Sequence, residues 1–166
     1  MKIHFTLNGT PTELEVQTDD MLLEVLRRDL DLRSVRATCG VGICGACTAL
    51  VDGRPISTCI FLAPLAEGCE ITTVEGLGGD HPVQRAFEEE HAFQCGYCTP
   101  GMILTIKSFL EEHPTPSDEE IKVALGGNLC RCGCYVKIIR ACKSVMNHTR
   151  TGVIHHAPAE GVKQRE

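Results

Sequence analysis

The sequence lacks the features that would place the protein in a membrane, outside the cell or on nucleic acid. No apolar run approaches the roughly 18 residues that a membrane span requires. The N-terminus MKIHFTLNG also has no basic segment followed by an apolar one, as a secretory signal would. Lys and Arg number 16 against 22 Asp and Glu, a net charge of -6, whereas nucleic-acid phosphates need concentrated positive charge. We therefore expect a soluble, cytoplasmic protein with no membrane span and no nucleic-acid partner.

Cysteine, by contrast, is abundant, with 11 thiols in 166 residues. The share of cysteine lies below the roughly 8 to 10% that marks a disulfide scaffold. An odd number of thiols also cannot all be paired in disulfides within the chain. Disulfides do not persist in a reducing cytosol, so clustered thiols there more often bind metal or act in catalysis. A chain of this length holds one ordinary domain or two small ones around modest cores. Metal binding is therefore the preferred interpretation of the cysteines.

The first half of the chain has the pattern of a small sheet with one helix. Apolar and polar residues alternate on both sides of Asn8-Gly9, which predicts a β-hairpin, and two short strands around Asp52-Gly53 and one over 71–74 follow later. Between them, helical spacing runs over 21–30. Its candidate N-caps are Thr18, Asp19 and Asp20. We expect this α+β domain to span 1–76.

The second half loses the strand pattern and predicts a four-helix bundle over 77–150. The third of its helices opens with a capping box of Ser117 and Glu120. Residues 151–166 have no periodicity, so we expect a loose tail, in which His155-His156 is a weak candidate for metal binding. The helices are expected over 83–92, from an N-cap at Thr99 with Pro100 first in the helix to near Pro114, over 117–125, and along an apolar stripe from Tyr135 to Met146.

Three cysteines and three glycines fall within the nine residues CGVGICGAC. Cys39, Cys44 and Cys47 have C-x4-C-x2-C spacing and Cys59 follows after eleven residues, which is the plant-type ferredoxin arrangement for a 2Fe-2S cluster. The intervening glycines, Gly40, Gly42 and Gly45, permit positive φ, so backbone N–H groups can point at sulfur and raise the reduction potential. Zinc ribbons pair C-x2-C with C-x2-C, so the x4 spacing favours iron-sulfur over zinc.

Cys95 and Cys98 in QCGYCTPG, with Cys130 and Cys132 in GNLCRCGCY, make a second set of four. Their spacing alone leaves zinc open as an alternative. Both pairs lie at expected helix ends, where helix N-terminal dipoles would stabilise the negative charge of an iron-sulfur cluster. This context favours a second 2Fe-2S site.

The N-terminal cysteine loop, QCGYCTPGM and GNLCRC, in that order, closely resemble the small iron-sulfur subunit of the molybdenum hydroxylases. This is the family of xanthine dehydrogenase, aldehyde oxidoreductase, carbon monoxide dehydrogenase and 4-hydroxybenzoyl-CoA reductase. The resemblance covers about residues 1–147. It implies an N-terminal β-grasp ferredoxin-like domain and a C-terminal four-helix domain, each holding one 2Fe-2S cluster. It also implies an electron-transfer subunit of an oxidoreductase, with no catalytic residue and no substrate site on this chain.

The same resemblance implies partners and their order. A large subunit would carry molybdopterin and a further subunit FAD, in a dimer of heterotrimers. The cluster of the helical domain would lie next to the pterin, and the ferredoxin-like cluster would face the flavin. Gln94 and Cys132 are then the positions expected to touch the pterin. For Gln94, ordinary exposure to solvent is the alternative, because glutamine is mostly exposed.

The chain departs from the family pattern directly after Cys132, where Gly133-Cys134-Tyr135 stands in place of the usual Thr-Gly-Tyr. Cys134 is therefore a competing ligand candidate, and we predict that it is a bystander. Cys142 lies on the apolar stripe and is expected to be a small buried hydrophobe, whereas Cys69 begins a strand and has no assigned role.

Two other functions stay open at this point. A free two-cluster ferredoxin that shuttles by diffusion would account for the first motif equally well, but it has no need of the helical half. A zinc-stabilised interaction module is the third hypothesis, and colour separates it from the other two, since iron-sulfur proteins absorb visible light.

Overall fold

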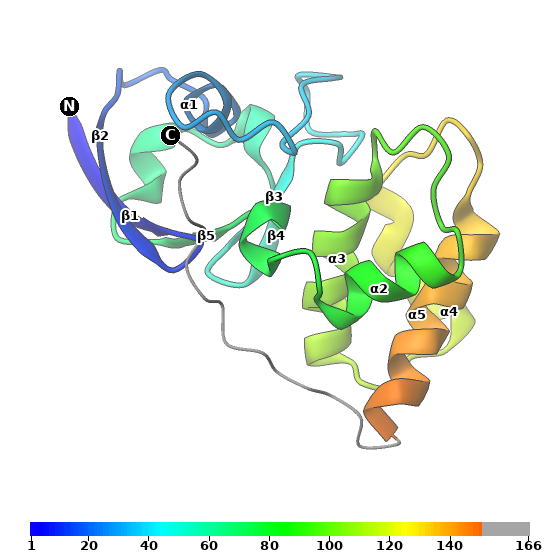
Figure 1. Ribbon diagram of the computed structural model, residues 1–166. Helices are drawn as coiled ribbons and strands as arrows, with labels where there is room; N and C mark the ends of the chain where they lie inside the picture. The colour runs from blue at the N-terminus through cyan, green and yellow to red at the C-terminus, as the bar shows by residue number, and fades with distance from the viewer. Residues whose placement is uncertain (151–166) are drawn as a thin grey trace, which may run out of the picture.

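The computed structural model describes residues 1–150, in which a small sheet is followed by a group of helices (Figure 1). The expected α+β fold class is confirmed, with the sheet in the N-terminal half and helices in the C-terminal half. The predicted tail at 151–166, with His155-His156, lies outside the described residues. Among the described residues, no helix has both the length and the apolar character that crossing a membrane requires.

Five strands form one mixed sheet in the order β2-β1-β5-β3-β4. The predicted hairpin is confirmed: β1 and β2 pair antiparallel around Asn8 and Gly9, whose φ values of 49° and 80° suit a tight two-residue turn. β5 pairs parallel with β1 and antiparallel with β3. The strands are β1 (Lys2–Leu7), β2 (Thr10–Glu15), β3 (Thr48–Val51), β4 (Arg54–Ser57) and β5 (Glu70–Thr72).

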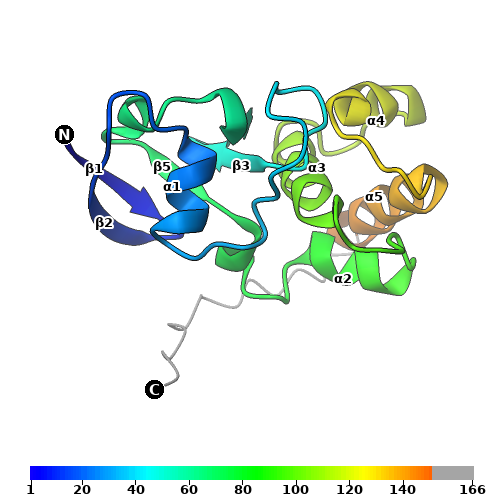
Figure 2. The ribbon, with the colours of Figure 1, turned by 90° about the horizontal axis from the view of Figure 1, so that it is seen from above.

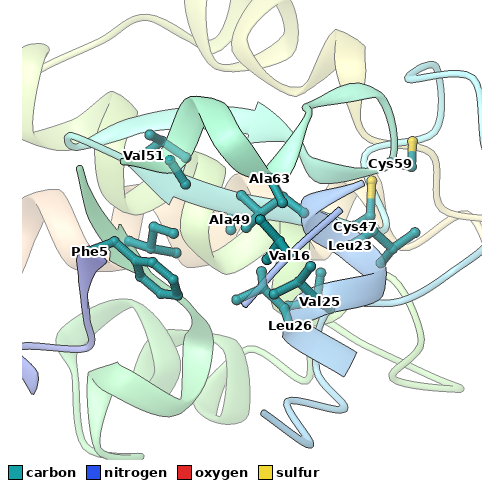
Figure 3. Close-up of a cluster of buried hydrophobic side chains, with 14 of the residues drawn as sticks. Phe5, Val16, Leu23, Val25, Leu26, Cys47, Ala49, Val51, Cys59 and Ala63 are labelled. Atoms are coloured by element: carbon teal, nitrogen blue, oxygen red, sulfur yellow. The ribbon is translucent and has the colours of Figure 1, made fainter. Parts of the chain in front are cut away.

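Helix α1 (Leu22–Arg28) closes the N-terminal core. Its apolar face packs with the inward side chains of β1, so Ile3, Leu22 and Leu26 are fully buried. Figure 3 shows this core, with Cys47 and Cys59 at one edge. Three short 3-10 helices follow in this part of the chain: η1 (Thr58–Ile60), η2 (Ala63–Ala66) and η3 (Val74–Leu77), and the last of these packs against the helical half.

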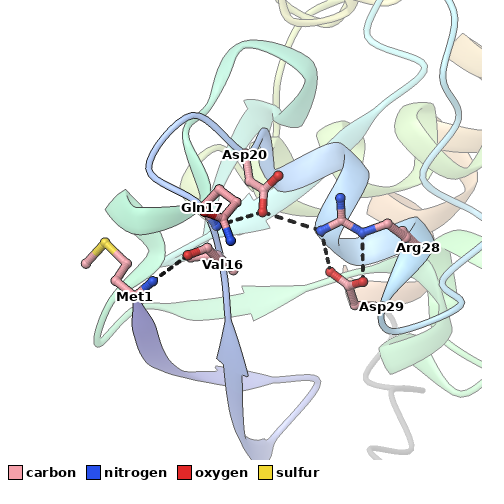
Figure 4. A network of polar contacts seen from close by, with 6 residues as sticks. All are labelled: Met1, Val16, Gln17, Asp20, Arg28 and Asp29. Carbon is pink, nitrogen blue, oxygen red and sulfur yellow. Dashed lines mark hydrogen bonds and ion pairs between the residues drawn. The ribbon is translucent and has the colours of Figure 1, made fainter.

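The predicted side-chain caps of α1 are wrong, because the helix begins one residue later and Met21 occupies the N-cap position. Asp20 instead accepts a hydrogen bond from the backbone N–H of Gln17 at 2.9 Å and pairs with Arg28 at 3.4 Å (Figure 4). The N-terminal amine donates to the carbonyl of Val16 at 2.6 Å, which ties the start of β1 to the end of β2 (Figure 4). The side chain of Asp20 thus gives the backbone N–H of Gln17 a hydrogen-bond partner in the turn before the helix, and does not cap the helix.

The four expected helices are present among the described residues. The capping box of Ser117 with Glu120 is confirmed. The expected cap at Thr99 is wrong by one position, since Cys98 is the N-cap and Thr99 already belongs to the helix. The helices are α2 (Pro82–Glu89), α3 (Thr99–Glu112), α4 (Asp118–Ala124), which continues into η4 (Leu125–Gly127), and α5 (Tyr135–Arg150).

Helix α3 lies between the sheet and the other helices (Figure 2). It contacts β3 and β4 on one side and α2, α4 and α5 on the other. Met102, Leu104 and Ile106 are all almost fully buried, as expected of a helix covered on several faces. The Ser108 hydroxyl donates to the carbonyl of Gly53 at 2.8 Å in the β3–β4 turn. The two halves of the chain are therefore packed against each other through α3.

Candidate metal centres

The first group of thiols lies where one loop meets the end of the sheet. Cys39, Cys44 and Cys47 belong to the segment between α1 and β3, and Cys59 is in η1 directly after β4. The three glycines of that segment have φ values of 69°, 76° and 65°, as the sequence predicted for Gly40, Gly42 and Gly45. The loop therefore folds back toward η1 and brings the fourth thiol to the other three.

Backbone N–H groups surround the sulfur of Cys39. The Val41 N–H donates to it at 3.5 Å, and this contact, with those of the Cys44 thiol and nearby backbone, lowers the pKa of Cys39 to about 6. Burial and the neighbouring thiol of Cys47 have the opposite effect on Cys59 and raise its pKa to about 11. Positive N–H dipoles therefore stabilise a thiolate at Cys39.

The second group of thiols gathers at three helix ends of the helical half. Cys95 is exposed after α2, Cys98 caps α3, and Cys130 and Cys132 lie between η4 and α5. Burial and the approach of Cys130 raise the pKa of Cys98 to about 12. The backbone N–H of Tyr97 and the thiol of Cys132 lower the pKa of Cys95.

Cys130 has polar contacts at both its sulfur and its backbone N–H. Burial would raise the pKa of Cys130, but the N–H of Cys134, 3.4 Å from its sulfur, and the thiol of Cys98 lower it overall. Its own backbone N–H donates to the Tyr135 hydroxyl at 2.8 Å, and that hydroxyl donates to the carbonyl of Asn128 at 3.1 Å. Sequence reasoning missed this role of Tyr135 and placed it only on the apolar stripe of α5.

Within each group the thiols approach one another in pairs. In the first group Cys39 contacts Cys44, and Cys47 contacts Cys59. In the second group Cys95 contacts Cys132, and Cys98 contacts Cys130. Among the described residues, no three His, Cys, Asp or Glu side chains are arranged to hold a single metal ion. A 2Fe-2S cluster takes four thiolates, two on each of its irons, so the donor chemistry and the pairing fit such a cluster in both groups.

The remaining candidate residues have distinct positions. Gln94 is exposed, and its side-chain amide donates to the carbonyl of Cys132 at 3.4 Å, so the two positions expected to touch the pterin are adjacent. Cys134 is 4% exposed and also contacts Cys130 through its side chain. Cys142 is fully buried, as expected. Cys69 directly precedes β5 rather than beginning it, and burial raises the pKa of its thiol.

The glycine introduced after Cys132 has a clear conformational use. Gly133 has a φ of 74°, in the left-handed region that favours glycine. In the turn that leads into α5, the residue with positive φ is therefore Gly133. The family pattern has its glycine one position later, where this chain has Cys134.

Comparisons with known proteins agree with this two-part arrangement. Residues 5–72 match the 2Fe-2S iron-sulfur cluster binding domain family, and residues 73–143 match the 2Fe-2S binding domain family. The chain is 48% identical over 139 residues to the nicotinate dehydrogenase small FeS subunit of Eubacterium barkeri, which covers 82% of this chain and 88% of that one. It is 41% identical over 143 residues to the nicotine 6-hydroxylase small subunit of Paenarthrobacter nicotinovorans, covering 85% and 87%.

Solved structures give the same result. Quinoline 2-oxidoreductase from Pseudomonas putida 86 has a chain with a TM-score of 0.85 and 42% identity, covering 93% of this chain and 98% of that one. Aldehyde oxidoreductase from Desulfovibrio gigas has a TM-score of 0.87 and 32% identity, with 92% of this chain matched to 17% of that longer one.

The fold and the two thiol groups define a protein with two 2Fe-2S binding domains. Together with the relatives, they show more: the chain belongs to the small 2Fe-2S subunits of the molybdenum hydroxylases. It is the iron-sulfur electron-transfer subunit of a multi-subunit oxidoreductase whose partner subunits, by family, carry molybdenum and FAD.

Proposed function

We propose that eight cysteines form the ligand sets of two 2Fe-2S clusters. Cys39, Cys44, Cys47 and Cys59 hold one, and Cys95, Cys98, Cys130 and Cys132 hold the other. The observation that carries this assignment is the approach of the thiols in two pairs within each group. Cys134 also contacts Cys130 and is proposed to be a bystander. When bound, each cluster supplies a carrier for one electron at a time. Each contacting pair is proposed to hold one iron.

The protein around the thiols has two tasks in this account. Backbone N–H groups, such as that of Val41 at Cys39 and that of Cys134 at Cys130, donate to the ligand sulfurs and favour the reduced, more negative state. Burial of Cys44, Cys47 and Cys59 excludes water from one side of the first site.

The thiols of the second group are more exposed than those of the first, and this difference supports an order of electron flow. We propose that electrons enter through the helical half, where Gln94 and Cys132 touch the molybdopterin of the large subunit. The exposure of Gln94 and Cys95 and the hydrogen bond from Gln94 to Cys132 support a contact here. Electrons then leave through the first site to the FAD of another subunit or to an external acceptor. The complete enzyme is proposed to be a dimer of heterotrimers in the cytoplasm.

The proposed division of the chain places the ferredoxin-like domain at 1–76, the helical domain at 77–150 and a tail at 151–166. Two separate clusters of buried hydrophobic side chains support a boundary in this region. Val74 and Leu77 in η3 already pack against the helical cluster, which supports a boundary close to η3.

Purification of the native protein tests the assembly. Size-exclusion chromatography of an extract should show this chain co-eluting with a molybdenum-containing chain and with FAD, at a mass that fits two copies of each subunit. Elution of the native chain alone as a stable, coloured monomer would favour the free shuttle and contradict the proposal.

A further inference from the structure

A backbone hydrogen bond joins the loop of the first thiol group to the loop of the second. The N–H of Leu129 donates to the carbonyl of Cys44 at 2.9 Å. Cys44 belongs to the first group, and Leu129 is covalently bonded to Cys130 of the second. A path from the sulfur of Cys44 to the sulfur of Cys130 therefore follows covalent bonds and crosses one hydrogen bond.

Glycines and one buried amide hold the two loops at this close approach. The side-chain amide of Asn128, which is 4% exposed, donates to the carbonyl of Gly45 at 3.2 Å. A Cβ on Gly101, in the first turn of α3, would overlap that same carbonyl oxygen, and a Cβ on Gly45 would overlap the carbonyl oxygen of Gly127. Only glycine permits backbones to approach this closely, so a side chain at either position would push the loops apart.

We propose that the hydrogen bond from Leu129 to Cys44 is the electron-transfer connection between the two clusters, and that Gly101 and Asn128 are positioning residues that set its length. This inference rests on the ligand sets of the proposed function. In the step one electron leaves the centre held by Cys130 and its partners, which is oxidised. The electron enters the centre held by Cys44 and its partners, which is reduced, and no bond is made or broken. The reductant is the molybdenum centre of the large subunit.

The physical reason is that electronic coupling decays more slowly along covalent and hydrogen bonds than across a gap. A second contact between the two loops provides the comparison. Tyr97, between two ligands of the second group, donates from its hydroxyl to the carbonyl of Ala37 at 2.8 Å, two residues before Cys39. That route also crosses a hydrogen bond, but it includes the whole tyrosine side chain and so is longer. The Leu129 route is therefore the stronger connection.

Leu129→Pro removes the connecting N–H, and the proline Cδ in its place would push the carbonyl of Cys44 away. Asn128 has φ -121° and ψ 114°, the extended conformation that a residue before proline prefers. The matched control is Leu129→Ala, which keeps the N–H and shortens a side chain that is 54% exposed. Both variants are to be made in the holoenzyme. Flash photoreduction with a substoichiometric dose of electrons, followed by rapid freezing, then shows by EPR how fast electrons redistribute between the two cluster signals.

Electron exchange should slow in Leu129→Pro, because the hydrogen bond to Cys44 is lost, and stay unchanged in Leu129→Ala. Iron content and both signals should persist in each variant. Exchange at the wild-type rate in Leu129→Pro with both signals present would overturn the proposal, as would slow exchange in Tyr97→Phe alone.

A second pair of variants decides the matter if Leu129→Pro loses a cluster. Gly101→Ala should slow exchange and weaken the magnetic interaction between the two reduced signals, because the loops move apart. Gly126→Ala is its control, since a Cβ there would meet no described atom within 4 Å. Unchanged rate and magnetic interaction in Gly101→Ala would overturn the proposal. Failure of the proposed function is a different result, because the unmodified holoenzyme would then lack two 2Fe-2S signals.

Discussion

Replacing Gly45 by alanine should destabilise the first cluster site more than the same change at Gly40. Both residues have positive φ, 65° and 69°, where a Cβ costs roughly 1–2 kcal/mol. At Gly40 the new Cβ would meet no described atom within 4 Å, so this strain is the whole cost. At Gly45 the Cβ would also overlap the backbone of Gly127 and the side chain of Asn128. Overpacking of that kind adds about 1–3 kcal/mol, which brings the total to about 2–5 kcal/mol.

The effect is large against the roughly 5–15 kcal/mol by which domains are stable. For a chain of this size each kcal/mol shifts the unfolding midpoint by about 2–4 °C. Gly40→Ala should therefore lose its visible absorbance about 2–8 °C below wild type on heating, and Gly45→Ala about 4–20 °C below. Gly42→Ala should lie between them, because its Cβ would meet only the side chain of Ile60, which is 58% exposed and free to move.

The assay is bleaching of the iron-sulfur absorbance during a thermal ramp, with iron measured in each purified variant before heating. Equal midpoints for Gly45→Ala and Gly40→Ala, at full iron content, would refute the reasoning. The packing of the first cluster loop against Gly127 and Asn128 would then carry no stability.

Three further predictions concern single side chains. Cys134→Ala should keep full iron content and both EPR signals whereas Cys132→Ala loses one, and the reverse pattern would show that Cys134 is the ligand. Tyr135→Phe leaves the N–H of Cys130 unpaired at a cost of about 1–3 kcal/mol, so the helical-domain signal should bleach first on heating. Loss of both signals at the same temperature would show that the hydrogen bond from Cys130 to Tyr135 contributes nothing. Burial would raise the pKa of Glu75, but hydrogen bonds from Ser34 and Thr73 hold it below the ordinary 4.5. The stabilisation that ionised Glu75 supplies is therefore present above pH 4.5 and is lost as the pH falls through the lowered pKa of the folded protein. Glu75→Gln should melt earlier than wild type near neutral pH and equally in strong acid, and a difference that persists in acid would contradict this.

Local signals made much of the fold predictable. The Asn8-Gly9 turn and the capping box at Ser117 are encoded within a few residues, and both are confirmed. The errors lie at helix starts that tertiary contacts decide. The carboxylate of Asp20 accepts a hydrogen bond from the backbone of Gln17 and pairs with Arg28, so it does not cap α1. Cys98 occupies the N-cap position of α3.

The spacing of Cys39, Cys44 and Cys47 predicted that these thiols lie together, because they share one short loop. Cys95 and Cys98 lie far from Cys130 and Cys132 in the sequence, and their grouping rested on the expected helix ends. The connection between the motifs could not be predicted in this way. Leu129 and Cys44 are far apart in the sequence, and the buried Asn128 has no pattern that marks it as a contact of Gly45. The same holds for Tyr97, whose hydroxyl reaches Ala37 from the other half of the chain.

Low-temperature EPR of the dithionite-reduced native enzyme, with iron and zinc counted per copy of this chain, tests the central claim most directly. The account predicts two distinct 2Fe-2S signals, one for each thiol group, and four irons for each chain because each cluster contains two. One signal, half the expected iron and bound zinc in the other thiol group would contradict it.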